Sequence, residues 1–101
     1  MKSKVLKYMG FARKSGNLVS GVNTCTLNMS RGKVELVILA EDISEGSEKK
    51  IMKEIRKNNV KFVKYGKSEV MSQATGATGR QVFAVLDRNF ADVILKEIDQ
   101  S

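Results

Sequence analysis

The sequence contains no histidine, no proline and a single cysteine among its 101 residues. Without histidine the chain cannot form the Ser-His or Cys-His pairs of many nucleophilic enzymes, nor a zinc site that uses imidazole. One cysteine cannot form an internal disulfide or provide the thiolates of a four-ligand zinc site. We therefore expect a non-catalytic protein that uses no cofactor and no metal.

Long apolar runs are absent as well. No run approaches the roughly 20 residues that a membrane-spanning helix requires, and the N-terminus lacks the apolar stretch of a secretory signal. The single cysteine fits a reducing compartment, and 42% hydrophobic residues in 101 suffice for one domain with its own core. We expect residues 1–101 to form one cytoplasmic domain that is monomeric and does not bind membranes.

Acidic residues are missing from the first third of the chain. Residues 1–34 contain seven Lys or Arg and no Asp or Glu, whereas residues 35–101 contain eleven of each sign. The whole net charge of +7 therefore lies in the first third. Such an excess predicts an acidic partner, with nucleic acid first and an anionic membrane second; a basic surface without a partner is the alternative. We expect these cations to form a single surface.

Helical and strand patterns alternate along the chain. Apolar residues at helical spacing predict helices at 3–13, 22–31, 44–58, 68–74 and from Asn89 onward. Short apolar runs predict strands at 18–20, 35–40, 60–65 and 81–86. In the last helix we expect Phe90, Val93, Ile94 and Ile98 to face inward. The predicted fold class is α/β, a three-layer α-β-α sandwich with a central mixed sheet of about four strands.

The step from the strand at 18–20 to the helix at 22–31 is the most informative part of the sequence. Gly21 lies at this junction, and a helix start leaves backbone N–H groups that favour an anion. Helical periodicity turns Cys25 inward, where it is a small core residue. The outward face carries Asn23, Thr24, Leu27 and Arg31.

Amide and hydroxyl side chains at a helix start can meet base edges and phosphates. We therefore expect the N–H groups of Gly21 and Val22 to hold a phosphate, and Asn23 and Thr24 to contact bases. Five cations are expected to neutralise flanking phosphates: Arg13, Lys14, Arg31, Lys33 and Arg80.

Two other motifs offer catalytic interpretations. The loop 76–80 resembles a phosphate-binding loop, but it lacks the Gly-Lys-Ser/Thr ending and a strand follows it. Glu41 and Asp42 follow an apolar strand, where a Mg²⁺ site is one interpretation. The other interpretation, which we favour, is that the two residues belong to a solvated loop or cap the following helix.

Several motifs occur in a characteristic order. Leu-Val-Ser-Gly at 18–21 is followed by Leu-Val-Ile-Leu-Ala-Glu-Asp at 36–42 and by Val-Phe-Ala-Val-Leu-Asp-Arg-Asn-Phe-Ala at 82–91. This set resembles the L7Ae/L30e superfamily of ribosomal proteins, and Ala-Arg-Lys-Ser-Gly at 12–16 is similar to its small bacterial YlxQ-type branch. The resemblance covers nearly the whole chain. It implies an α-β-α sandwich and RNA binding, in the best-known members to kink-turns.

In that family the junction carries Gly-x-Asn-Glu-x-x-Lys, whose Asn, Glu and Lys contact the tandem G·A pairs of a kink-turn. Gly21 and Asn23 match this motif, whereas Thr24 replaces the Glu and Leu27 replaces the Lys. Thr24 offers no carboxylate to guanine N–H groups, and Leu27 cannot donate to guanine acceptors. The family's second contact, the loop before the last strand, corresponds to Ala77, Thr78, Gly79 and Arg80.

We expect a non-catalytic RNA-binding protein that is associated with the ribosome or binds kink-turn-like structured RNA. The RNA partner could be ribosomal RNA or another folded RNA. Two alternatives stay open. One is a protein-interaction module on the same fold, in which Leu27 makes an apolar contact. The other is a small metal-dependent enzyme that uses Glu41 and Asp42.

Overall fold

The computed structural model describes residues 4–100. Its helices are α1 (Lys4–Lys14), α2 (Val22–Ser30), α3 (Glu45–Asn58), α4 (Ser68–Ala74) and α5 (Arg88–Asp99). Its strands are β1 (Leu18–Ser20), β2 (Leu36–Leu39), β3 (Phe62–Lys64) and β4 (Val82–Val85). The predicted elements are all present, with ends that differ by at most a few residues from the expected ones.

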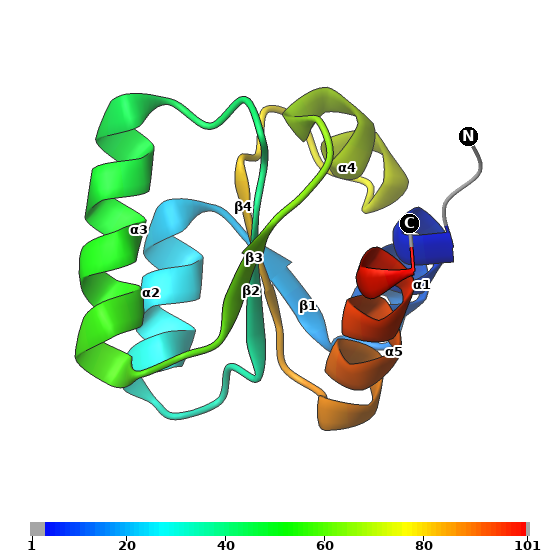
Figure 1. The fold of residues 1–101 in the computed structure, drawn as a ribbon, viewed down its shortest axis with the longest axis horizontal. Helices are drawn as coiled ribbons and strands as arrows, with labels where there is room; N and C mark the ends of the chain where they lie inside the picture. Colours follow the sequence, from blue (N-terminus) through cyan, green and yellow to red (C-terminus); the bar gives the residue numbers. More distant parts are fainter. Residues whose placement is uncertain (1–3, 101) are drawn as a thin grey trace.

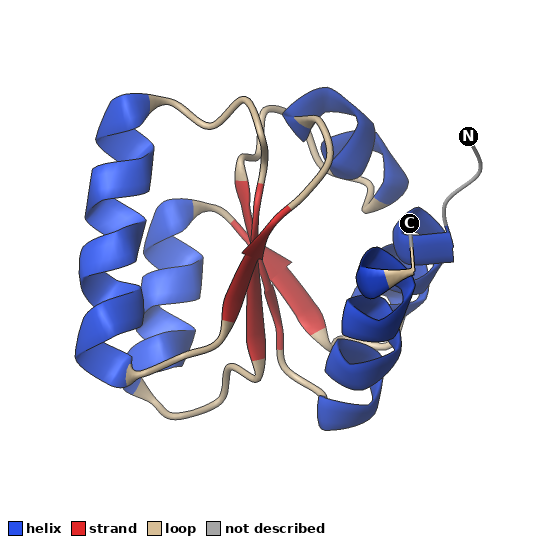
Figure 2. Ribbon diagram, in the orientation of Figure 1, coloured by secondary structure: helices blue, strands red, loops and turns tan. Residues whose placement is uncertain are grey.

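The four strands form one mixed sheet in the order β1-β4-β2-β3. β2 and β3 are parallel, whereas β4 runs antiparallel to both of its neighbours, β1 and β2. Helices cover both faces of this sheet (Figure 2): α2 and α3 pack on one face, and α1, α4 and α5 lie on the other (Figure 1). The predicted three-layer α-β-α sandwich with a mixed sheet is confirmed.

The topology defines two ends of the sheet. We call the end at which β1, β2 and β3 finish and β4 begins the carboxyl edge; it is the upper end of the sheet in Figure 1. The amino edge is the opposite end, where β1, β2 and β3 begin and β4 finishes. Helices α2, α3 and α4 begin at the carboxyl edge, whereas α1, α2 and α3 end at the amino edge.

The core lies on both faces of the sheet. All residues of β2 and β4 are buried, which agrees with the expectation from their continuous apolar runs. Alternate residues of a strand point to opposite faces, so Ile38 and Phe83 pack with Met9 and Ile94 on one side. The other side contains a cluster built around Val37, with Cys25, Met29, Ile51 and Ile55.

One predicted core position is wrong. Val93 was expected to face inward, but its exposed fraction is 38%. Ala91 and Ile94 form the buried stripe of α5, and Val93 is turned about 100° from Ile94 on the helix. Val93 therefore lies at the border of the helix–helix contact. No helix in the described part of the chain is long and apolar enough to cross a membrane.

Candidate functional site

The junction between β1 and α2 lies at the carboxyl edge. Gly21 caps the helix with φ of +95°, a conformation that residues with a Cβ rarely adopt. Its N–H group donates to the Val82 carbonyl oxygen at 2.9 Å. The expectation that this N–H holds a phosphate is therefore wrong, because the chain at Gly21 still pairs with the start of β4.

The next donors along the chain are open. The N–H groups of Val22, Asn23 and Thr24 occupy the first turn of α2, where the helix itself offers no acceptor. In the described part of the chain, the helix start receives no side-chain cap hydrogen bond from its N-cap residue, Gly21. The Asn23 and Thr24 side chains are exposed, as is that of Leu27 at 48%. The start of α2 thus presents backbone donors, an amide and a hydroxyl to solvent on one side of the molecule.

The loop that leads into β4 approaches this junction, because β4 is the strand next to β1. This loop contains Ala77, Thr78, Gly79 and Arg80. The Arg80 guanidinium lies directly over Gly21: a Cβ placed on Gly21 would be 2.9 Å from Arg80 Nη1. The pairing of Ser20 with Phe83 places both segments at the same end of adjacent strands. The structure therefore brings together the two segments that the resemblance singled out.

Ser72 holds the loop in place. Its side chain is 2% exposed, and its Oγ donates to the Arg80 carbonyl at 3.0 Å while it accepts from the Arg80 N–H at 2.9 Å. The Ala77 N–H donates to the Ser72 carbonyl at 2.8 Å. Sequence reasoning did not assign this role, because a serine on a short helix gives no periodic signal. Only the contact across the loop identifies it.

Cys25 lies beneath the junction. It is fully buried, and its Sγ is 3.8 Å from the carbonyl oxygens of Val19 and Val82. Burial raises the pKa of the Cys25 thiol to about 12, although the nearby Arg80 charge acts in the opposite direction. The thiol therefore stays protonated at neutral pH. The full burial of Cys25 confirms the prediction that it is a core residue.

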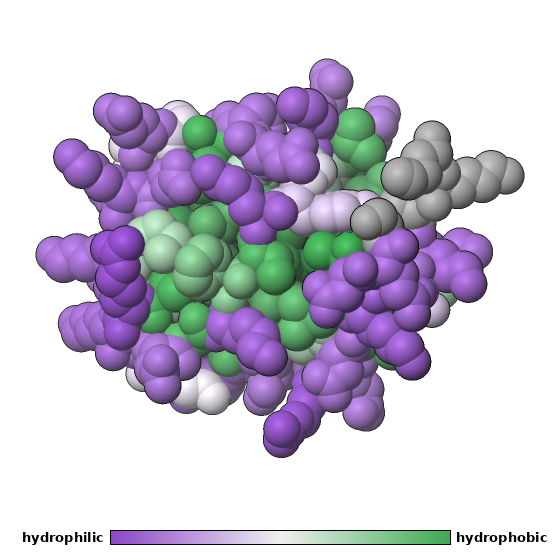
Figure 3. Space-filling view, in the orientation of Figure 1, coloured by the Kyte–Doolittle hydropathy of each residue, from purple (hydrophilic) through white to green (hydrophobic). Residues whose placement is uncertain are grey.

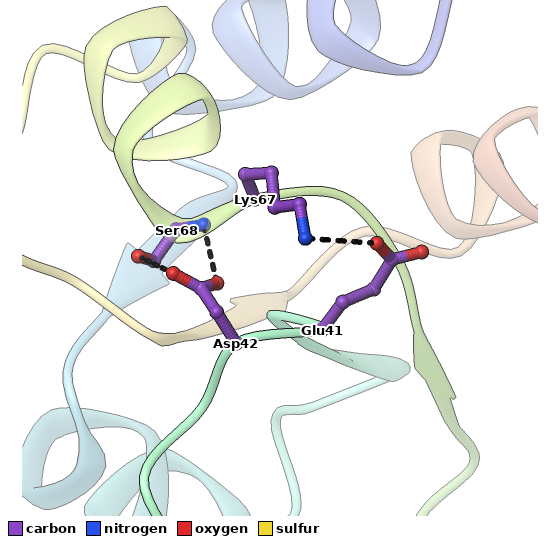
Figure 4. Close-up of polar contacts among 4 residues, drawn as sticks. All are labelled: Glu41, Asp42, Lys67 and Ser68. Carbon is purple, nitrogen blue, oxygen red and sulfur yellow. Dashed lines mark hydrogen bonds and ion pairs between the residues drawn. The ribbon is translucent and has the colours of Figure 1, made fainter.

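Glu41 and Asp42 bind the connection that leads into α4 (Figure 4). Asp42 accepts from the Ser68 N–H at 2.8 Å and from the Ser68 hydroxyl at 2.7 Å. These bonds, the hydroxyl first, lower the pKa of the Asp42 carboxyl. Glu41 lies 4.0 Å from Lys67 Nζ. Asp42 therefore caps α4 and not the following helix α3, which Ser44 caps.

These two carboxylates do not assemble a metal site with others. Among residues 4–100, no group of three or more His, Cys, Asp or Glu side chains is arranged to hold a metal ion. Both oxygens of Asp42 already accept hydrogen bonds from Ser68. Asp42 caps α4 and Glu41 pairs with Lys67, so the expected cap for the following helix α3 is wrong.

The remaining predicted cations lie at the other end of the sheet. Arg13 and Lys14 end α1, and Arg31 and Lys33 follow α2, so all four are at the amino edge. The nine residues of α2 carry the chain about 14 Å away from Gly21. A single cationic surface centred on Gly21 is therefore wrong, and of the five predicted phosphate-binding cations only Arg80 lies beside the junction.

The carboxyl edge is in fact acidic. Its connections and adjoining helix turns are residues 21–25, 40–48 and 65–81. They contain two cations, Lys67 and Arg80, against five carboxylates, which are Glu41, Asp42, Glu45, Glu48 and Glu69. Lys64, the last residue of β3, also lies at this edge and pairs with Glu48 at 2.9 Å, and the carboxylates still outnumber the cations. The junction thus combines an open helix start and one arginine with a local excess of negative charge.

The family comparison agrees with this architecture. The family model of the Ribosomal protein L7Ae/L30e/S12e/Gadd45 family matches residues 3–95. The chain is similar to the RNA-binding protein YlxQ of Bacillus subtilis (strain 168), with 28% identity over 91 residues that cover 90% of this chain and 91% of the relative. It is 26% identical to the RNA-binding protein YlxQ of Enterococcus faecium over 90 residues, which cover 89% of this chain and 86% of the relative.

Solved structures share the fold. A protein of unknown function from Bacillus halodurans C superposes with a TM-score of 0.89 at 26% identity, covering 97% of this chain and 99% of its own. The Giardia lamblia 15.5kD RNA binding protein superposes with a TM-score of 0.74 at 19% identity, covering 96% and 83%. At that lower identity the likeness shows the fold alone.

Proposed function

The chain belongs to the ribosomal protein L7Ae/L30e/S12e/Gadd45 family, and from this membership we propose that it is a non-catalytic, cytoplasmic RNA-binding protein. Its partner is a structured RNA, either on the ribosome or with a kink-turn-like bend. The names of the curated relatives and the net charge of +7 support an RNA partner. The geometry of the carboxyl edge supports a site for a bent or unpaired step.

The approach of Arg80 to Gly21 is the observation that carries this proposal. It sets a guanidinium beside the open N–H groups of α2, so that both can face one phosphate. The exposed Asn23 and Thr24 then offer an amide and a hydroxyl to base edges. The small residues at 77–79 leave room for a nucleotide to approach the loop.

The junction is expected to read a bend more than a particular base pair. Thr24 and Leu27 lack the charges that contact G·A pairs in the family motif, and the surrounding carboxylates repel a continuous backbone. A bent RNA brings few phosphates close to this edge while it exposes bases. We therefore propose binding to bent RNA with modest base discrimination.

The test compares a kink-turn RNA with a plain duplex of equal length. We expect tighter binding to the kink-turn, and Asn23→Ala should weaken that complex by about 1–3 kcal/mol while it changes duplex binding little. Gln100→Ala is the matched control, because Gln100 is an exposed amide at the end of α5, in the helical layer opposite α2. Equal affinity of the wild-type protein for both RNAs would reject bend recognition.

Restoring the family motif provides a gain-of-function arm. The double variant Thr24→Glu with Leu27→Lys replaces two exposed side chains, so the fold should tolerate it. Because a carboxylate accepts from guanine N–H groups and Lys donates to guanine acceptors, the variant should bind kink-turn RNA about tenfold or more tightly. An unchanged affinity would place the RNA away from this face of α2.

A protein-interaction module is the second candidate function. The observation that favours it is Leu27, a large apolar side chain that is 48% exposed on the outer face of α2. An apolar protein contact changes little with salt, whereas RNA binding weakens steeply. A salt titration of the natural complex therefore separates the two functions.

A further inference from the structure

The amino edge collects charge from four separate parts of the chain. Its connections and adjoining helix turns are residues 11–17, 27–35, 55–61 and 86–91. They contain two carboxylates, Glu35 and Asp87, against eight cations, which are Arg13, Lys14, Arg31, Lys33, Arg56, Lys57, Lys61 and Arg88. All eight cationic side chains are exposed. The amino edge is therefore basic, whereas the carboxyl edge is acidic.

Within residues 4–100, no acidic side chain forms an ion pair with these cations. The ion pairs between residues 4 and 100 are Lys64 with Glu48 and Lys67 with Glu41, both towards the carboxyl edge, so no cation of the amino edge is paired there. One of the two local carboxylates, Asp87, accepts from the Phe90 N–H at 2.9 Å and caps α5. The eight positive charges therefore face solvent.

Helix dipoles explain only part of this cluster. Cations stabilise the C-terminal turn of a helix, which accounts for Arg13 and Lys14 in α1 and for Arg56 and Lys57 in α3. Lys61 lies in a connection, outside any helix. Arg88 is the first residue of α5, where the dipole disfavours a cation. Fold stability therefore does not account for the whole set.

The cations also come from both helical layers. Arg13 and Arg88 belong to the layer of α1 and α5, whereas Arg31 and Arg56 belong to the layer of α2 and α3. In Figure 3 hydrophilic side chains project from the lower border of the molecule, where this edge lies. The edge extends along the longest molecular dimension, 33 Å, so it can contact a linear polyanion over several phosphates.

We propose that the amino edge is a second RNA surface, which binds the phosphate backbone and is separate from the junction at Gly21. This inference rests on the proposed RNA-binding function. The strands run along the 26 Å dimension, and the two surfaces lie at its opposite ends. An RNA that contacts both surfaces therefore bends around the sandwich or provides two segments.

An aromatic side chain at the same edge supports RNA over an anionic membrane. Phe11 is 51% exposed beside an open pocket of about 380 Å³, which Tyr8, Phe90 and Val93 also line. Asp87 also lines this pocket. An exposed aromatic ring offers a face on which an unpaired base can stack. Membrane-surface binding commonly uses one amphipathic helix with a broad apolar face or one contiguous polybasic segment, whereas these cations are spread over four segments.

The test neutralises the four amino-edge cations that sequence reasoning did not assign. The variant combines Arg56→Gln, Lys57→Gln, Lys61→Gln and Arg88→Gln. We expect its affinity for duplex RNA to fall about tenfold or more at low salt, and the slope of log K against log salt to decrease by about 3 to 4. Circular dichroism and thermal melting check that the variant is folded.

The control variant removes the same charge elsewhere. Lys49, Lys50, Lys53 and Lys96 are exposed and lie outside the amino edge, and all four are changed to Gln. This control should keep the wild-type slope. An equal loss in both variants would overturn the proposed surface in favour of net charge alone.

Three further outcomes are decisive. If wild-type protein binds no RNA, the proposed function itself fails. If the amino-edge variant retains full binding and slope while Arg80→Gln and Asn23→Ala lose binding, only the second surface is rejected. If wild-type protein prefers phosphatidylserine vesicles to RNA, and the amino-edge variant loses that preference, the edge is a membrane surface and the proposal is overturned.

Discussion

The two edges of the sheet differ in the groups that they expose and in their charge. The carboxyl edge carries an open helix start, an arginine over a glycine, and an excess of carboxylates. The amino edge carries eight exposed cations on separate segments. Short-range hydrogen bonds select a shape or base, whereas clustered charge supplies affinity that depends on salt. In the proposed RNA complex the two contributions are therefore separated in space.

The largest expected effect comes from the core that both edges share. Phe83 is fully buried in β4, and Phe83→Ala should lower the free energy of unfolding by about 3–5 kcal/mol. Both RNA surfaces should be lost together. Denaturant unfolding measures the change. Phe11→Ala, at a ring that is 51% exposed, is the control and should cost less than about 1 kcal/mol. Comparable losses would contradict the assigned burial.

Changing Gly21 should affect one edge alone. Gly21→Ala places a Cβ at positive φ and 2.9 Å from Arg80 Nη1, so we expect a loss of about 1–3 kcal/mol and displacement of the guanidinium. Discrimination between kink-turn and duplex should disappear while the salt slope stays. Gly46→Ala is the control, because Gly46 lies in α3 with open space around it. A wild-type preference in Gly21→Ala would show that Arg80 placement is irrelevant.

Ser72 tests whether the loop must be held in place. Ser72→Ala leaves the Arg80 N–H and carbonyl without this partner, so we expect a loss of about 1–3 kcal/mol in stability. Kink-turn preference should weaken, and duplex binding through the amino edge should persist. Ser30→Ala changes an exposed serine on α2 and serves as the control. Binding titrations with both RNAs measure this preference. An unchanged preference for kink-turn RNA in Ser72→Ala would contradict the positioning role.

The smallest expected effect is on the stability at low pH, through Asp42 at the carboxyl edge. Because the Ser68 bonds lower the pKa of Asp42 in the folded protein, its contribution to stability is present above the ordinary carboxyl pKa near 4. That contribution is lost as the pH falls through the lower, folded-state pKa. Wild-type protein should therefore melt at a higher Tm than Asp42→Ala at neutral pH, and the difference should vanish in strong acid. A difference that grows on acidification would contradict this sign.

Local pattern predicted much of the fold. Continuous apolar runs predicted β2 and β4 as buried strands, and helical spacing predicted Cys25 as an inward residue. The helix start at Gly21 followed from a glycine after a short apolar strand. These features depend on neighbours in the chain, so sequence reasoning reached them. Val93 failed because its burial depends on how α5 meets α1.

The sequence by itself determined the alternation of elements, the buried stripes, the helix start at Gly21 and the net charge of +7. Tertiary structure alone decided where that charge lies. Arg31 is ten positions from Gly21 yet lies at the opposite edge, because α2 carries the chain across the sheet. Arg13, Lys61 and Arg88 are distant in sequence yet share one edge. Arg13 and Lys61 precede strands that begin there, and Arg88 follows β4, which runs antiparallel and finishes there.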